Sequence, residues 1–226
     1  RKAMTNNIPT DRNIVFDIII ALVKGKIKDD RLEYVANGKT FALHSVSYLL
    51  GQTIRQYVLP ESHILVSEGA QKLWMQISDE DIKTKHHRDS VICKNKTAIN
   101  VPMYNGSRNA PAYEQLTYGE KFPFNNVFHD EHMIPIKIIV QQLVELKELT
   151  YANVERILNQ MYVCKILKDE DRRIKPKSNR PNCLIKVVDQ CYTTADITVV
   201  DWKKIKADYL LQCGSDCTNC PLIINN

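Results

Sequence analysis

Apolar residues in this chain occur in short segments of two different periodicities, and none of the segments is long. The longest apolar run, residues 14–23, is interrupted by Asp17 and falls far short of the roughly 20 residues that a membrane-spanning helix needs. Helical spacing, which predicts helices, occurs at residues 11–26, 45–58, 69–77, 135–149 and 150–158. Short β-favouring runs, which predict strands, occur at residues 64–66, 161–167, 183–188 and 197–200. The two kinds of element together predict an α+β fold.

Turn-forming residues divide these segments. Asn37 and Gly38 lie between two apolar stretches and predict a hairpin over residues 33–43, because both residues of such a turn must accept a positive φ. Residues 78–126 are polar and rich in Asn, Lys, Pro and Gly, which predicts loops.

Length and charge narrow the class of protein. With 226 residues, of which 44% are hydrophobic, the chain can build one large core or two smaller ones, and the composition excludes intrinsic disorder and small disulfide scaffolds. The net charge of +5 suits a polyanionic partner. An odd number of cysteines, seven, favours a reducing, cytoplasmic compartment. We expect no membrane association.

Residues 128–135, with the sequence FHDEHMIP, place four ionisable side chains in succession before a proline. Pro135 suits the first turn of a helix, because its missing N–H needs no partner there, and it biases the preceding residue toward extended structure. Glu131 and His132 therefore lie where an extended segment is expected to meet a helix.

A second acidic group follows the β-favouring stretch at 161–167. Asp169, Glu170 and Asp171 occupy an expected helix start, where the macrodipole favours negative charge. Basic residues follow directly: Arg172, Arg173, Lys175, Lys177 and Arg180. A basic run beside carboxylates suits contacts with phosphate groups.

Together these segments resemble the core of HNH (ββα-metal) endonucleases. The resemblance rests on Glu131-His132-x-x-Pro135, the helix after it, the strand at 161–167 and the acidic helix start, and it covers residues 122–181. It implies a ββα-metal core embedded in a larger helix-rich α+β domain. It also implies metal-dependent hydrolysis of DNA phosphodiester bonds, by a nuclease of the restriction or defence type.

The resemblance implies a role for each matching residue. His132 is the general base that activates water, and Glu131 is a ligand of Mg²⁺ or Mn²⁺. No histidine follows His132 in the sequence, so Asp171 or Glu170 takes the place of the family's last histidine ligand. The basic run contacts the DNA, and cutting of both strands at a symmetric site would favour a homodimer. His129 is expected to be a hydrogen-bonded surface histidine, with a second ligand or a substrate contact as the alternative.

These residue types suit that chemistry. An imidazole with a pKa near about 6.5 can accept a proton from water around neutral pH. A hard cation such as Mg²⁺ prefers carboxylate oxygens as ligands and stabilises the negative charge that grows on a phosphate during hydrolysis.

Three cysteines lie close together near the C-terminal end of the sequence: Cys213, Cys217 and Cys220. A structural Zn²⁺ site needs four ligands, so it would require a further thiolate such as that of Cys183 or Cys191. Free thiols and a local disulfide are the alternatives.

Three regions are expected: a helical and hairpin region at 1–121, the nuclease core at 122–181, and a small α/β element with the cysteine cluster at 182–226. Two functions compete with the nuclease. One is a non-catalytic nucleic-acid-binding module that uses the same basic residues. The other is a secreted, disulfide-containing interaction domain.

Overall fold

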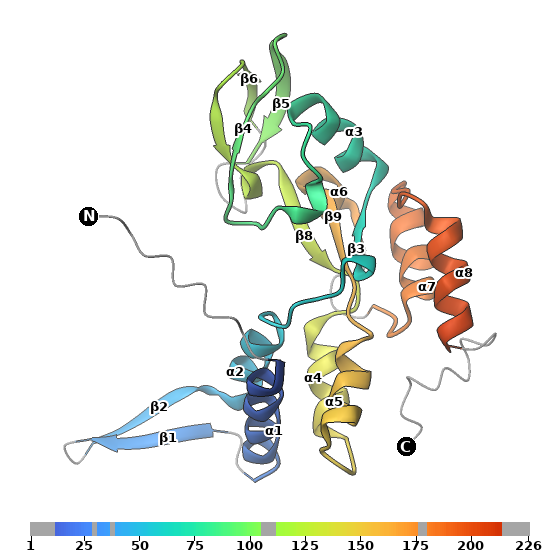
Figure 1. The fold of residues 1–226 in the computed structure, drawn as a ribbon. Helices are drawn as coiled ribbons and strands as arrows, with labels where there is room; N and C mark the ends of the chain where they lie inside the picture. Colours follow the sequence, from blue (N-terminus) through green and yellow to red (C-terminus); the bar gives the residue numbers. More distant parts are fainter. Residues whose placement is uncertain (1–11, 29–30, 37–38, 105–111, 176–179, 214–226) are drawn as a thin grey trace. The chain divides into compact units, whose positions relative to one another are not determined.

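The computed structural model describes residues 12–28, 31–36, 39–104, 112–175 and 180–213 (Figure 1). The chain divides into two compact units, of which one comprises Arg1–Val58 and Ile136–Gln160 and the other Leu59–Pro135 and Met161–Asn226. The structure is a mixed α+β fold with small sheets. The bounds of the two units differ from those of the three regions expected from the sequence. Residues 136–160, which lie within the expected nuclease core, belong to the first unit and pack with the N-terminal helices.

The first unit is built from helices and one hairpin. Its helices are α1 (Arg12–Lys28), α2 (Val46–Ile54), α4 (Ile136–Val144) and α5 (Tyr151–Leu158). Its antiparallel strands are β1 (Arg31–Ala36) and β2 (Lys39–Ser45), while the expected turn at Asn37 and Gly38 lies outside the described residues. The helices bury one apolar face each, including Ile19, Leu50 and Ile139, as the helical spacing predicts.

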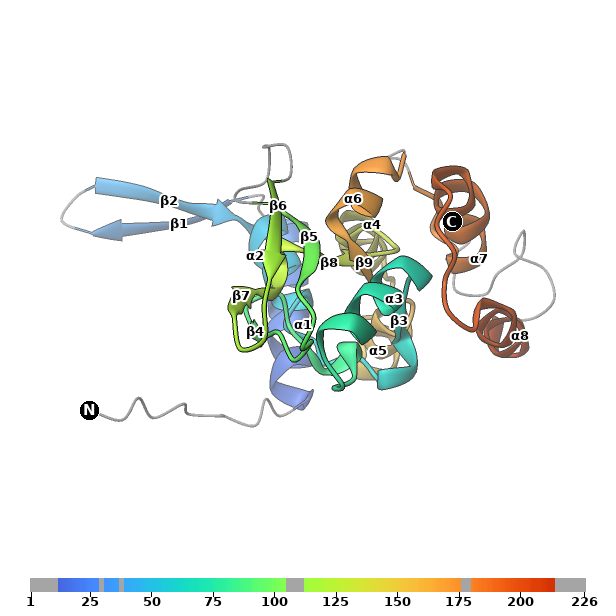
Figure 2. The same ribbon diagram turned by 90° about the horizontal axis from the view of Figure 1, so that it is seen from above.

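The second unit contains a three-stranded sheet with the order β3-β9-β8 (Figure 1). Strand β9 (Val163–Leu167) is central; β3 (Ile64–Val66) pairs with it in parallel, and β8 (Phe128–His132) pairs with it antiparallel. Both β3 and β9 lead directly into a helix, namely α3 (Glu68–Ile77) and α6 (Lys168–Arg173). Ser67 begins α3, since its Oγ accepts a hydrogen bond of 3.0 Å from the Ala70 backbone N–H. Figure 2 shows α3 and β3 beside β9.

A separate apolar core covers each face of this sheet. On one face, Cys164 and Ile166 of β9 pack against α7 (Leu184–Val187), a π-helical turn (Val188–Tyr192) and α8 (Trp202–Cys213). On the other face, Phe128 of β8 packs with Trp74 and Phe124, and the Phe124 and Phe128 rings stack at 4.8 Å.

Residues 78–126 form two small antiparallel sheets, so the prediction of loops there is wrong in part. Strand β4 (Ser90–Ile92) pairs with β7 (Lys121–Pro123), and β5 (Ile99–Met103) pairs with β6 (Ala112–Leu116). Short 3₁₀ turns lie at Glu61–His63, Ile82–Thr84, Phe124–Asn126 and Thr193–Ala195. These strands are three to five residues long and bury only one or two side chains each, so they leave a weak periodic signal.

The predicted strand at 183–188 is also wrong, because Leu184–Val187 is helical and a π-helical turn continues it. Its aliphatic residues favour strands, yet Leu184, Val187 and Val188 are all buried in the helical conformation, so tertiary packing outweighs the local preference. Residues 197–200 form a single bridge between Ser67 and Val199 instead of a strand. Among the described residues, no helix combines the length and apolar character that crossing a membrane requires.

Candidate metal centre

Three ionisable side chains of the second unit meet at the outer strand of the sheet. His129 and Glu131 come from β8, and Asp171 comes from α6. The ligand atoms that these three side chains offer lie within 4.8 Å of one another. We call this group the β8–α6 cluster.

The register of β8 on β9 brings His129 and Glu131 to one face. His129 lies opposite Ile166 and Glu131 opposite Cys164, and residues two apart in a strand point to the same side. Asp130, between them, points to the other side, where its Oδ1 accepts a hydrogen bond of 2.8 Å from Lys165 Nζ. Strand β8 therefore places the imidazole of His129 and the carboxylate of Glu131 on the same face of the sheet.

Asp171 reaches the cluster because α6 is held tightly at its start. The Lys168 N–H donates to the Val127 carbonyl oxygen at 3.0 Å, which places α6 against the beginning of β8. Glu170 holds the same helix to α3: its Oε2 accepts hydrogen bonds from Ser67 Oγ at 2.5 Å and from the Leu167 N–H at 2.8 Å. Position 171 is thus fixed by two strands and a neighbouring helix.

Glu131 is mostly buried and is engaged at both carboxylate oxygens. His129 Nε2 lies 3.1 Å from Oε2, and Arg180 Nη1 donates to Oε1. Burial alone would raise the pKa of Glu131, but the hydrogen bond with His129 and the charge of Arg180 outweigh it and lower that pKa to about 2. Glu131 is therefore ionised throughout the physiological pH range.

His129 is perturbed in the opposite direction. Burial alone would lower its pKa, yet the hydrogen bond with Glu131 and the negative charges of Asp171, Glu131 and Asp130 raise the pKa of His129 above 6.5. The imidazole is about two-fifths exposed at its side chain, so it borders solvent while it contacts the buried carboxylate.

Neutral, buried groups lie behind Glu131. Burial, reinforced by the charge of Glu170, raises the pKa of the Cys164 thiol well above its ordinary value. Burial likewise raises the pKa of Tyr192. Both groups stay uncharged, so the ion pairs of Glu131 border a region of low dielectric constant. Electrostatic interactions are stronger there than in water.

The donor set fits a hard divalent cation. Glu131 and Asp171 supply carboxylate oxygens, which Mg²⁺ and Mn²⁺ prefer, and the imidazole of His129 lies beside them. Two atoms bound to one Mg²⁺ are at most about 4.2 Å apart. The separations of up to 4.8 Å in the cluster would therefore need only a small closing movement.

The residues expected from the HNH-like motif do not all lie in this cluster. Glu131 and Asp171 belong to it, whereas His132 and Glu170 do not. His132 pairs with Val163 at the last position of β8, and the alternation of the strand turns its side chain away from the face of Glu131. Glu170 is buried and points toward Ser67. His129, which we expected to be a surface histidine, takes the position beside the two carboxylates.

The basic residues expected to contact DNA have different environments. Arg180 is buried and binds Glu131, so it does not present its charge at the surface. Arg173 is exposed and donates to the Ala195 carbonyl oxygen at 2.7 Å. Lys175 is exposed, and Lys177 lies outside the described residues.

Arg172 is exposed as well and lies on an aromatic ring. Its guanidinium carbon is 4.2 Å from the centre of the Tyr104 ring, and Lys168 Nζ is 5.9 Å from the same centre. The Tyr104 hydroxyl bonds Asp169, which ties this ring to α6. Two cations one helical turn apart thus share an aromatic platform next to Asp171.

The described cysteines do not form a zinc site. Cys93, Cys164, Cys183 and Cys191 are buried and free of disulfides. Cys217 and Cys220 lie outside the described residues, as does the side chain of Cys213, so the expected zinc cluster there stays a prediction.

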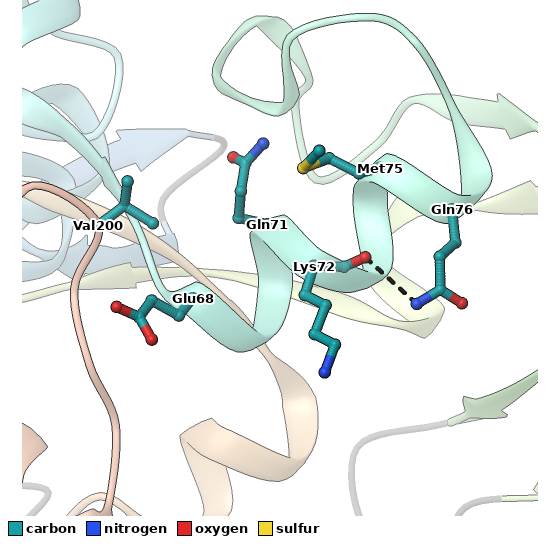
Figure 3. A pocket seen from close by; sticks show the side chains of 6 residues that line it. All are labelled: Glu68, Gln71, Lys72, Met75, Gln76 and Val200. Atoms are coloured by element: carbon teal, nitrogen blue, oxygen red, sulfur yellow. Dashed lines mark hydrogen bonds between the residues drawn. The ribbon is translucent and has the colours of Figure 1, made fainter.

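A surface hollow of about 470 Å³ lies on the outer side of α3 (Figure 3). Its lining consists of Glu68, Gln71, Lys72, Met75, Gln76 and Val200, and it includes no residue of the β8–α6 cluster. Met75 is 70% exposed there. The ionisable side chains of this lining are Glu68 and Lys72, and it contains no histidine or pair of carboxylates, so the β8–α6 cluster is the stronger candidate site.

In comparisons with known proteins, no family model, no curated protein and no solved structure matches the chain. The chemistry of the site therefore rests on its own geometry.

Proposed function

We propose that this protein is a metal-dependent endonuclease that hydrolyses DNA phosphodiester bonds, with the β8–α6 cluster as its centre. The observation that carries the proposal is the meeting of His129, Glu131 and Asp171, whose ligand atoms lie within 4.8 Å of one another. The order of elements supports it: two antiparallel strands, β8 and β9, are followed directly by the helix that supplies the last ligand, as in the ββα-metal core that the motif resembles.

The proposed roles follow from the chemistry of each side chain. Glu131 and Asp171 hold Mg²⁺ or Mn²⁺ through carboxylate oxygens. When bound, the cation would stabilise the negative charge that develops on the phosphate and on the leaving oxygen. His129 borders both solvent and the carboxylates, so we assign its neutral form the role of general base, which accepts a proton from the attacking water.

The nucleic acid would approach from the side of α6. Arg172 and Lys168 are held over Tyr104 beside Asp171, and Arg173 and Lys175 are exposed just beyond. Cations in such positions contact phosphates and fix the register of the strand without reading its sequence.

The test is plasmid nicking in Mg²⁺ and in Mn²⁺. We expect the wild type to nick, and Glu131→Gln and Asp171→Asn to lose the activity while they retain DNA binding in a mobility-shift assay. Asp189→Asn is the matched control, because Asp189 is a half-exposed carboxylate on the π-helical turn, and it should nick like the wild type. Undiminished nicking by Glu131→Gln and Asp171→Asn would exclude this centre.

A pair of histidine variants separates the two candidate bases. The geometry predicts that His129→Ala loses activity by roughly 10²–10⁴-fold, and that His132→Ala retains most of it. The motif predicts the reverse. Circular dichroism of both variants would show that each is folded.

One observation favours a second function, a nucleic-acid-binding module that does not cleave. Arg180 and His129 already compensate the charge of Glu131, so the cluster does not need a cation for its own stability. This alternative predicts that the wild type binds DNA in a salt-dependent manner and never nicks in either metal.

A further inference from the structure

We propose that Arg180 is an internal counter-ion that stands in for the metal: it stabilises the metal-free fold and weakens the binding of a divalent cation to the β8–α6 cluster. This inference rests on the proposed function, because it takes Glu131 to be a metal ligand. It gives Arg180 a role different from the DNA contact that its place in the basic run suggests.

The contacts of Arg180 carry the inference. Its side chain is 2% exposed, and its Nη1 donates both to Glu131 Oε1 and, at 3.3 Å, to the His132 carbonyl oxygen. Arginine is rarely buried unless it is paired, and a buried guanidinium cannot lose its proton to escape the cost of burial. Arg180 is thus a fixed positive charge at the end of β8.

The same contacts divide the Glu131 carboxylate into two halves. Oε1 binds Arg180, while Oε2 lies 3.1 Å from His129 Nε2. A cation held by Glu131 would therefore lie near the guanidinium that binds the same carboxylate. Arg180 and the cation would share one negative charge at a separation of a few ångströms.

Removing Arg180 has two opposite effects on the affinity of the cluster for a divalent cation. The larger effect decides whether that affinity rises or falls. Arg180 orients the carboxylate, and loss of such an outer partner typically weakens metal binding about 10–100-fold. Its charge, however, repels a divalent cation nearby. At an effective dielectric constant of about 20 and a separation of about 6 Å, this repulsion would weaken binding by roughly 10⁴-fold, which exceeds the benefit of orientation. In addition, its removal leaves Glu131 buried without that counter-ion, and a cation can relieve this defect.

The experiment compares Arg180→Met, which removes the charge, with Arg180→Lys, which keeps a positive charge in a similar volume. Manganese affinity is measured on the full chain by calorimetry, and the melting temperature is measured with and without Mn²⁺. We expect Arg180→Met to melt lower than the wild type in EDTA, to bind Mn²⁺ at least about tenfold more tightly, and to gain more from Mn²⁺ in melting temperature. Arg180→Lys should lie close to the wild type in Mn²⁺ affinity.

A folded Arg180→Met protein that binds Mn²⁺ no more tightly than the wild type would overturn the inference, as would equal changes in both variants. If Arg180→Met is unfolded in EDTA, Mn²⁺ should restore its fold, and failure to do so also overturns it. The wild type distinguishes failure of this inference from failure of the proposed function. If the wild type neither nicks DNA nor binds Mn²⁺, the nuclease proposal itself is contradicted.

Discussion

Glu170 offers the sharpest test of how α6 is positioned. Its Oε2 alone accepts both hydrogen bonds, from Ser67 Oγ at 2.5 Å and from the Leu167 N–H at 2.8 Å. Replacement by alanine leaves two donors without their acceptor, and one of them, Ser67, is fully buried. At about 1–3 kcal/mol for each orphaned buried donor, we expect Glu170→Ala to lose about 3–4 kcal/mol of unfolding free energy.

Glu170→Gln is the matched control for chemistry. Its amide oxygen can take the place of Oε2 and accept both hydrogen bonds, so only their charged character is lost. Since hydrogen bonds to charged groups are worth roughly 1 kcal/mol more than neutral ones, we expect a loss of about 1–2 kcal/mol. Glu114→Ala, at an exposed site on β6, should stay within about 0.5 kcal/mol of the wild type.

Tryptophan fluorescence during urea unfolding is the appropriate assay. The chain has two tryptophans, Trp74 and Trp202, and both belong to the second unit, so the signal reports the unit that contains Glu170. If Glu170→Ala unfolds at the wild-type midpoint, or if Glu170→Gln loses as much as Glu170→Ala, the acceptor role of Oε2 is refuted.

Three further predictions concern the same unit. A Cβ at Gly69 would clash with Glu170 Oε1, so Gly69→Ala should lose about 1–3 kcal/mol of unfolding free energy in the same urea assay. Gly25→Ala, which has open space around the added Cβ, should lose no stability by circular dichroism. Lys165→Met removes the buried cation that pairs with Asp130 and should lower the free energy of unfolding by about 3 kcal/mol. An unchanged urea midpoint for this variant would contradict the pairing. Burial lowers the pKa of His63 below 6.5, against the hydrogen bond with the Met161 carbonyl, so the unfolded chain takes up this proton first as the pH falls. The stability that neutral His63 contributes is therefore complete above about pH 6.5 and is lost below it, and His63→Gln should flatten the change in urea midpoint between pH 7.5 and pH 5.5; an unchanged slope would show that another group is responsible.

The local elements around the site could be predicted from the sequence because their signals are local. Thr150 caps α5 through a hydrogen bond of 3.2 Å from the Asn153 N–H, Pro135 directly precedes α4, and the β-favouring residues before Lys168 form β9. Each of these signals depends on side chains within a few residues of the element. Helix α5 and strand β9 consequently lie within two residues of their predicted bounds, whereas α4 ends at Val144, five residues before the predicted end.

The composition of the cluster could not be predicted in the same way. A motif places Glu131 and His132 together because they are neighbours in sequence, but neighbours in a strand point to opposite faces. Which face meets Asp171 depends on the register of β8 on β9 and on the anchoring of α6 at Val127, and both are tertiary features. The alternation of the strand was the one available signal, since it pairs His129 with Glu131.

The long sequence separation between Glu131 and Asp171 does not prevent the two carboxylates from sharing a site. The ladder of β8 and β9 continues past His132, because the Met133 N–H donates to the Tyr162 carbonyl oxygen at 3.0 Å. The chain therefore leaves the sheet and returns to it at adjacent positions, and residues 136–160 between them belong to the other unit. The entropic cost of closing a loop rises only slowly with its length, and here α4 and α5 gain their own packing in return. For the geometry of the cluster, β8 and β9 act as a hairpin with a helical pair inserted at its turn, so the distance along the chain carries little information about whether the two carboxylates can meet.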